Sequence, residues 1–212
     1  MSKTITRIYP DYASADLAIK DLKQAGLSNN DISILASNAE GWHRANGGDV
    51  DPKHDKDRDG RDDRSEGAAA GAGIGAVALG ALGALAGLGL LAIPGVGPIV
   101  AAGWLASTAA GAVAGGVTGG IVGALVESGI SKENAELYLE SIRRGGTLVS
   151  ARVPDDERDR YERILAGSAI DVSRRESTYR ETGWNGYDPN RPACDLSEVE
   201  AERQRYRTER GI

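Results

Sequence analysis

Residues 67–126 read GAAAGAGIGAVALGALGALAGLGLLAIPGVGPIVAAGWLASTAAGAVAGGVTGGIVGALV and carry no charged side chain, although 26% of the whole chain is charged. Seventeen of these sixty residues are glycine, and most of the others are Ala, Leu, Val or Ile. Four helix breakers, Pro94, Gly95, Gly97 and Pro98, lie together near the centre of the stretch. The stretch therefore predicts two apolar helices that fold back on each other through a turn at these four residues.

Glycine recurs at intervals of four residues along both predicted helices. Residues four apart share one face of a helix, so each arm would carry a smooth strip on which another backbone packs closely. Such packing offsets the loss of about 1 kcal/mol that each glycine brings to a helix. The predicted helix-packing residues are Gly67, Gly71, Gly75, Gly83 and Gly87 on the first arm and Gly103, Gly111, Gly115, Gly119 and Gly123 on the second.

Two environments suit a hairpin of this composition, and the sequence leaves both open. Each arm of roughly 25 residues would be about 37 Å long, enough to cross the hydrocarbon core of a bilayer. In the first environment the hairpin is inserted in a membrane or associated with it. In the second, a soluble homo-oligomer buries the hairpins between its subunits.

The section before the hairpin predicts a strand, a helix and a second strand. Residues 4–9 are β-prone, and Asp11 offers a cap for the helix that follows. Ala and Ile residues then recur at helical spacing until Gly26, a typical C-terminal stop. Residues 31–36 form the second predicted strand.

The section after the hairpin repeats this order. Ser131 caps a predicted helix that ends at Arg144, and residues 147–153 alternate as a strand. A second amphipathic helix leads to a strand predicted at residues 169–173. Two βαβ units of this size are the components of a ferredoxin-like sandwich.

The predicted fold class is α+β, a ferredoxin-like sandwich of two βαβ halves interrupted by a long apolar glycine-rich helical hairpin and followed by a charged C-terminal tail. The predicted organisation is a first βαβ half at 1–37, a polar acidic linker at 38–66, the glycine-zipper hairpin at 67–126, a helix plus the second βαβ half at 127–175, and a polar tail with a short helix at 176–212.

The order of these parts resembles the bacterial general-stress protein family, also described as heat-induced or low-temperature-induced stress proteins. Residues 10–36, 92–103 and 145–173 carry the resemblance, which covers residues 4–190. Its most specific part is the Ile-Pro-Gly-Val-Gly-Pro turn between the glycine-rich arms. The resemblance implies a stress-induced, often membrane-associated protein without a known enzymatic activity.

The acidic residues before the hairpin fit the calcium-loop pattern D-x-D-x-D-G-x5-E at every specified position. Asp62 stands where an EF-hand has an apolar residue, and the residues before the loop do not predict an entering helix. A lone calcium loop and a solvated, charge-mixed linker are both compatible with this sequence. The predicted ligands are Asp55, Asp57, Asp59, the carbonyl of Arg61, Asp63 and Glu66.

Composition and motifs argue against several functions. A net charge of −6 without a basic stripe argues against nucleic acid as a partner. His43 and His54 lie in the linker and Cys194 in the tail, and their spacing matches no catalytic or metal-binding motif. The sequence identifies no cofactor other than the calcium of this loop, and no small-molecule substrate. We therefore expect that the protein is not an enzyme.

The tail has one feature of defined structure. Ser197 and Glu200 form a predicted capping box for a charged helix that ends near Arg210. Val199 and Tyr206 share one face of this helix, so the helix either docks on the domain or a neighbouring subunit or frays.

The sequence as a whole predicts a non-enzymatic, stress-associated protein that self-assembles through its hairpin helices. The expected partners are other copies of the chain and membrane lipid. The expected location is the bacterial inner membrane, with the α+β domain facing the cytoplasm. The alternative is a soluble cytoplasmic scaffold, calcium-responsive through the acidic loop.

Overall fold

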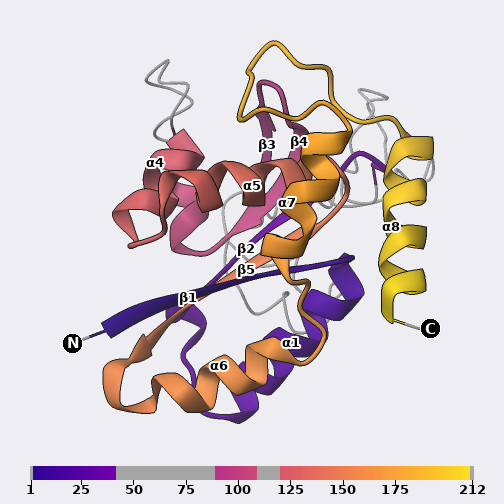
Figure 1. Cartoon of the computed structure of the whole chain (residues 1–212). Helices are drawn as coiled ribbons and strands as arrows, with labels where there is room; N and C mark the ends of the chain where they lie inside the picture. The colour runs from indigo at the N-terminus through magenta and orange to yellow at the C-terminus, as the bar shows by residue number, and fades with distance from the viewer. Residues whose placement is uncertain (1, 42–88, 109–119, 211–212) are drawn as a thin grey trace, which may run out of the picture.

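The computed structural model describes residues 2–41, 89–108 and 120–210 (Figure 1). Its centre is a five-stranded antiparallel sheet with the strand order β1-β5-β2-β4-β3. The strands are β1 (Ser2–Tyr9), β2 (Ile32–Ser37), β3 (Gly89–Ile93), β4 (Gly97–Ala102) and β5 (Thr147–Pro154). The helices are α1 (Tyr12–Gln24), α4 (Gly120–Glu127), α5 (Lys132–Arg143), α6 (Arg158–Ala166), α7 (Val172–Glu181) and α8 (Leu196–Arg210), with 3-10 turns η1 (Asn29–Asp31) and η3 (Asp155–Glu157).

Short-range signals in the sequence set the boundaries of α1 and α5. The amide of Ser14 donates to Oδ1 of Asp11 at 2.8 Å, and that of Asn134 donates to Oγ of Ser131 at 3.3 Å. These bonds satisfy amides that have no partner inside the first turn of a helix. Both predicted caps are therefore confirmed. The five-stranded sheet and the helices around it confirm the predicted α+β class.

Helices cover both faces of the sheet (Figure 1). α1 and α6 pack on one face, where Ile5, Ile34 and Val149 belong to a core shared with Ile19 and Leu165. α4 and α5 lie on the other face, over a second core that includes Leu35, Ile99, Leu125, Ile142 and Leu148. We call these the α1 face and the α5 face.

The prediction of helix is wrong for residues 89–92 and 99–102, on either side of the predicted turn. These residues form β3 and β4, and the chain reverses between the two strands at residues 94–96. β4 lies between β2 and β3, so Ile99 and Ala102 are fully buried. Short apolar runs of this kind suit a buried strand as well as a buried helix, and periodicity does not distinguish the two. Pro98 is accommodated because it stands near the start of its strand.

The prediction of a strand at residues 169–173 is also wrong. Only Ile170 pairs with β1, through a bond of 2.8 Å from its amide to the carbonyl of Ile8. Asp171 then caps α7, accepting the amide of Ser173 at 3.1 Å. The capping side chain starts a helix where the strand was expected to continue.

The C-terminal helix α8 docks on the domain, and its cap lies two residues before the predicted one. Oδ1 of Asp195 accepts the amide of Glu198 at 2.9 Å, and Oε2 of Glu198 accepts the amide of Asp195 at 3.0 Å. Val199 and Tyr206 are 1% and 3% exposed, so their shared face is buried as the docked alternative required.

Among the described residues, no helix has both the length and the apolar character that crossing a membrane requires.

Candidate functional site

The predicted calcium ligands, from Asp55 to Glu66, lie outside the described residues, as do His43 and His54. In the part of the chain that is described, no group of three or more His, Cys, Asp or Glu side chains is arranged to hold a metal ion. Eight predicted helix-packing residues also lie outside it: Gly67, Gly71, Gly75, Gly83, Gly87, Gly111, Gly115 and Gly119.

Gly103 packs against a strand and not against another helix, which corrects its predicted role. It joins β4 to the helical residues 104–108 with a φ of +83°. A Cβ atom on Gly103 would lie 2.3 Å from the carbonyl oxygen of Ile32 and 2.8 Å from the Cα of Ser33. Oγ of Ser33 accepts the amide of Leu105 at 3.1 Å, so this glycine lets the chain turn tightly over β2.

Gly123 faces the other way, toward open space. Ile121 and Leu125 of α4 are buried in the core of the α5 face, at 4% and 0% exposure. A Cβ atom on Gly123 would meet no heavy atom of the described residues within 4 Å, and Val126 is 42% exposed. α4 therefore turns its bulky side to the domain and its glycine side outward.

The predicted turn residues Gly95 and Gly97 lie beneath the segment that links α7 to α8. This segment, residues 182–195, runs across the top of β3 and β4 in Figure 1, and we call it the strap. A Cβ atom on Gly95 would lie 2.0 Å from the carbonyl oxygen of Asp188, and one on Gly97 would lie 2.8 Å from Cβ of Ala193. The hydroxyl of Tyr187 donates to the carbonyl of Pro94 at 2.7 Å.

A buried ion cluster at the end of α5 holds the strap from below. Arg143 donates to both carboxylate oxygens of Glu140 at 2.8 Å, and Nε of Arg144 donates to Oε1 of Glu140 at 2.8 Å. All three residues are less than 10% exposed. Burial raises the pKa of Glu140, but the bonds and charges of both arginines outweigh it and hold that pKa below its ordinary value.

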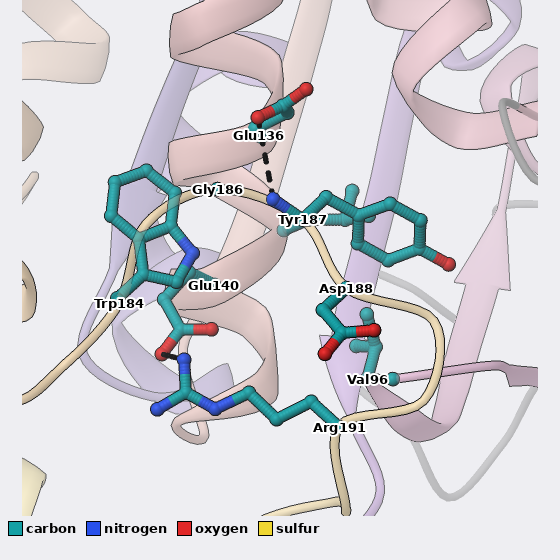
Figure 2. Close-up of a pocket in the computed structure, with 10 residues that line it drawn as sticks. Val96, Glu136, Glu140, Trp184, Gly186, Tyr187, Asp188 and Arg191 are labelled. Carbon is teal, nitrogen blue, oxygen red and sulfur yellow. Dashed lines mark hydrogen bonds and ion pairs between the residues drawn. The ribbon is translucent and has the colours of Figure 1, made fainter.

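The strap adds a third guanidinium to this carboxylate (Figure 2). Nη1 of Arg191 lies 3.6 Å from Oε1 of Glu140, and Nη1 of Arg143 donates to the carbonyl of Pro192 at 3.2 Å. On the next turn of α5, Oε2 of Glu136 accepts the amide of Tyr187 at 3.3 Å. The cavity between these groups measures about 10 Å³, room for a single water molecule and not for a substrate.

Beside the cluster, two tyrosines join α7 to α8. The hydroxyls of Tyr179 and Tyr206 lie 2.8 Å apart, and that of Tyr179 donates to Oγ of Ser141 at 3.3 Å. Burial raises the pKa of Tyr179 to about 12, so this hydroxyl stays protonated at neutral pH. Burial also raises the pKa of the Cys194 thiol to about 11, which makes it a poor nucleophile.

A larger, open hollow of about 600 Å³ lies where β5 ends. The guanidinium of Arg152, which lines it, stacks 3.9 Å from the ring centre of Trp104. Glu157, also in its lining, pairs with Arg160 at 3.3 Å. These lining groups are engaged by the protein itself, so the hollow is a poor candidate for chemistry.

Sequence reasoning missed Glu140, Arg143, Arg144 and Arg191. An acidic residue followed three and four positions later by arginines is typical of a solvated helix face. The position of the strap over this face depends on contacts between distant segments, for which the sequence holds no local signal.

The ion cluster of Glu140, Arg143 and Arg144, together with the strap that it binds, forms a structural clamp at the end of α5, and we call this set of residues the clamp.

Comparison with known proteins identifies no relative: no family model, no curated protein and no solved structure matches the chain.

Proposed function

We propose that the protein is a non-enzymatic, stress-associated protein that self-assembles through glycine-faced helix surfaces carried on its α+β domain. The observation that carries the proposal is the orientation of α4, with Ile121 and Leu125 inward and Gly123 outward. A glycine at an exposed helix position weakens the helix by about 1 kcal/mol. Close contact with a second copy would offset that loss.

Two features of the sequence support the proposal. Gly111, Gly115 and Gly119 precede Gly123 at the same four-residue interval, so a helix continuing through them would extend one strip. The stress context comes from the resemblance of the chain to the bacterial general-stress proteins.

We also propose that β1, α1, β2, β5 and α6 form a ferredoxin-like core. Its support is the order β1-β5-β2, in which β1 and β2 are parallel and flank β5, with α1 and α6 on the same face. The bridge at Ile170, on the outer side of β1, would be the remnant of the fourth strand.

Membrane association is the second candidate. Residues 67–88, the first 22 of the uncharged stretch, favour it, since about 20 apolar residues cross a bilayer. In this case the domain would face the cytoplasm at the bacterial inner membrane.

Gly123→Leu tests the self-assembly proposal, and Gly167→Leu is the matched control. Gly167 follows α6 with helical backbone angles, and a Cβ atom there would lie 3.8 Å from the carbonyl oxygen of Ile164, an ordinary contact within the same helix. Light scattering after gel filtration should give a smaller or heterogeneous particle for Gly123→Leu, because leucine holds the facing backbones apart. The control should keep the particle size of the original chain, and both variants should keep its melting temperature or exceed it.

An unchanged particle in Gly123→Leu would reject α4 as an assembly surface. Flotation of the original chain with liposomes separates the two candidates. A uniform detergent-free particle that does not float supports the soluble assembly, and flotation supports the membrane.

A further inference from the structure

The α1 face of the sheet carries an apolar row beyond the reach of α1 and α6. Val100 of β4 pairs with Ala36 of β2 on one side and with Leu90 of β3 on the other, so the three side chains lie in one row. Ala102 belongs to the core built by α1 and α6, and Val100 points to the same face because it lies two residues away. We call Ala36, Val100 and Leu90 the β4 row.

The described helices do not account for the burial of this row. α1 and α6 pack on β1 and β5, and their core reaches β4 only at Ala102. Val100 and Ala36 are nevertheless only 1% exposed. On the α5 face, in contrast, Leu91 and Ile99 of the same strands belong to the core under α4 and α5.

The path of the chain brings a connection to this place. β2 and β3 are both antiparallel to β4, so they are parallel to each other with β4 between them. Residues 38–88 therefore form a crossover that passes over β4 on one face of the sheet or the other. The α5 face above β4 is already filled, and the α1 face is the one left open by the described residues.

The hand of the connection agrees with the α1 face. The crossover β1-α1-β2 also joins parallel strands, across β5, and it advances across the sheet in the same direction. The two crossovers have the same hand only when both lie on the α1 face, and crossovers rarely differ in hand. Hand alone is not decisive, because the connection from β4 to β5 runs through α4 and α5 on the opposite face. The deciding observation is that α4 and α5 already cover β4 on the α5 face, whereas no described helix covers it on the α1 face.

We infer that the β4 row is the docking surface for the chain's own apolar segment, residues 67–88, which directly precedes β3. The segment has no charged residue, so it suits an apolar surface, and its end is fixed beside the row at Gly89. It supplies the bulk that the row lacks through Leu79, Leu82, Leu85 and Leu88. The segment is then part of the domain's own core and is not free to enter a bilayer or a neighbouring subunit.

Cysteine labelling of the full chain in a Cys194→Ala background tests the inference. Val100→Cys reports on the β4 row, and Ile99→Cys, one residue away on the α5 face, is the matched control. Both thiols should react with a maleimide about tenfold more slowly, or slower still, than that of Leu17→Cys, which replaces a 60% exposed side chain. Changing the four leucines of residues 79–88 to serine should restore fast labelling at position 100 and leave position 99 slow.

Three results would overturn the inference. The first is that the cysteine at position 100 reacts as fast as the one at position 17 while the four leucines are retained. The second is that it stays slow after the leucines are changed to serine. The third is that it loses its protection when the protein is diluted, which indicates that a second copy covers the row. If the serine changes unfold the domain, position 99 also becomes fast. A short bifunctional maleimide on Leu85→Cys/Val100→Cys, with every other leucine retained, then decides. An intramolecular cross-link is expected, and its absence at low protein concentration rejects the docking.

Discussion

Glu140 is a single carboxylate among three guanidinium groups, and this imbalance makes it the most consequential residue of the clamp. Arg143 and Arg144 bind it directly, and Arg191 approaches it from the strap. Removing one partner from a buried ion cluster leaves the remaining charges desolvated and unpaired. If the Glu140 carboxylate is removed, the buried charges of Arg143 and Arg144 lose their partner, and these unpaired charges destabilise the folded chain.

Glu140→Gln should lower the free energy of unfolding by about 3 kcal/mol. Glu136→Gln is the control, because Glu136 contacts the same strap with a more exposed side chain. Urea denaturation of both variants measures the difference. Equal losses in the two variants would show that the cluster has no special weight.

The same variant tests the pH dependence. Because the folded-state pKa of Glu140 lies below its ordinary value of 4.5, its contribution to stability is complete above that value. The contribution is lost as the pH falls through the folded-state pKa. Glu140→Gln should therefore flatten the decline of stability below about pH 4.5. A decline as steep as that of the original chain would assign it to other carboxylates.

At the scale of elements, the sequence predicted the features set by local hydrogen bonds but not those set by packing between distant segments. Asp11 and Ser131 start helices through bonds to residues three positions away, and both were predicted. The cap of α8 was misplaced because Asp195, Ser197 and Glu200 all fit capping patterns in sequence, and only the docked position of α8 selects among them. β3 and β4 were misassigned because an apolar run fits a buried helix and a buried strand equally well.

The docking of α8 depends on one glycine, which gives an element-scale prediction. Gly145 has a φ of +95°, and a Cβ atom there would lie 2.4 Å from Cγ1 of Val199 on α8. Gly26 has a φ of +100° with no atom of the described residues within 4 Å of its Cβ position, so Gly26→Ala introduces the same backbone strain without the clash. Gly145→Ala should therefore lower the melting temperature more than Gly26→Ala does.

A compensating change identifies the cause of that difference. Val199→Ala removes the clashing methyl groups and should recover part of the loss in the Gly145→Ala chain. Double-mutant thermal denaturation measures this coupling. Additive effects of the two changes would mean that the clash does not displace α8.

At the scale of the whole molecule, the sequence predicted a sandwich of two βαβ halves, with the apolar insertion as a separate helical hairpin between them. The sheet does unite β1, β2 and β5. The core of the α5 face, however, draws nine of its sixteen buried members from residues 93–125. The described part of the insertion therefore belongs to the core of the domain, which no pattern of charge or hydropathy distinguished from a separate hairpin.

Deleting residues 38–129 and joining the ends with a short linker should abolish cooperative thermal unfolding. The reason is that α5, Leu35 and Leu148 would lose most of their apolar partners. A deletion of residues 42–66 leaves all sixteen members in place and serves as the control, with cooperative melting expected. A sharp transition in the larger deletion would show that the two halves suffice.

The position of β5 between β1 and β2 has a consequence for folding during synthesis. Tyr9 of β1 pairs with Thr147, and Ile32 of β2 pairs with Ala151. During synthesis, both strands therefore lack their shared neighbour β5 until more than a hundred further residues have been translated. At about 5–20 residues per second, translation leaves β1 and β2 without their shared neighbour for several seconds. Pairings of such long range are also slow to form after synthesis. The nascent chain thus carries its uncharged stretch and two open strand edges together, and it is in this interval that chaperones have the most to protect.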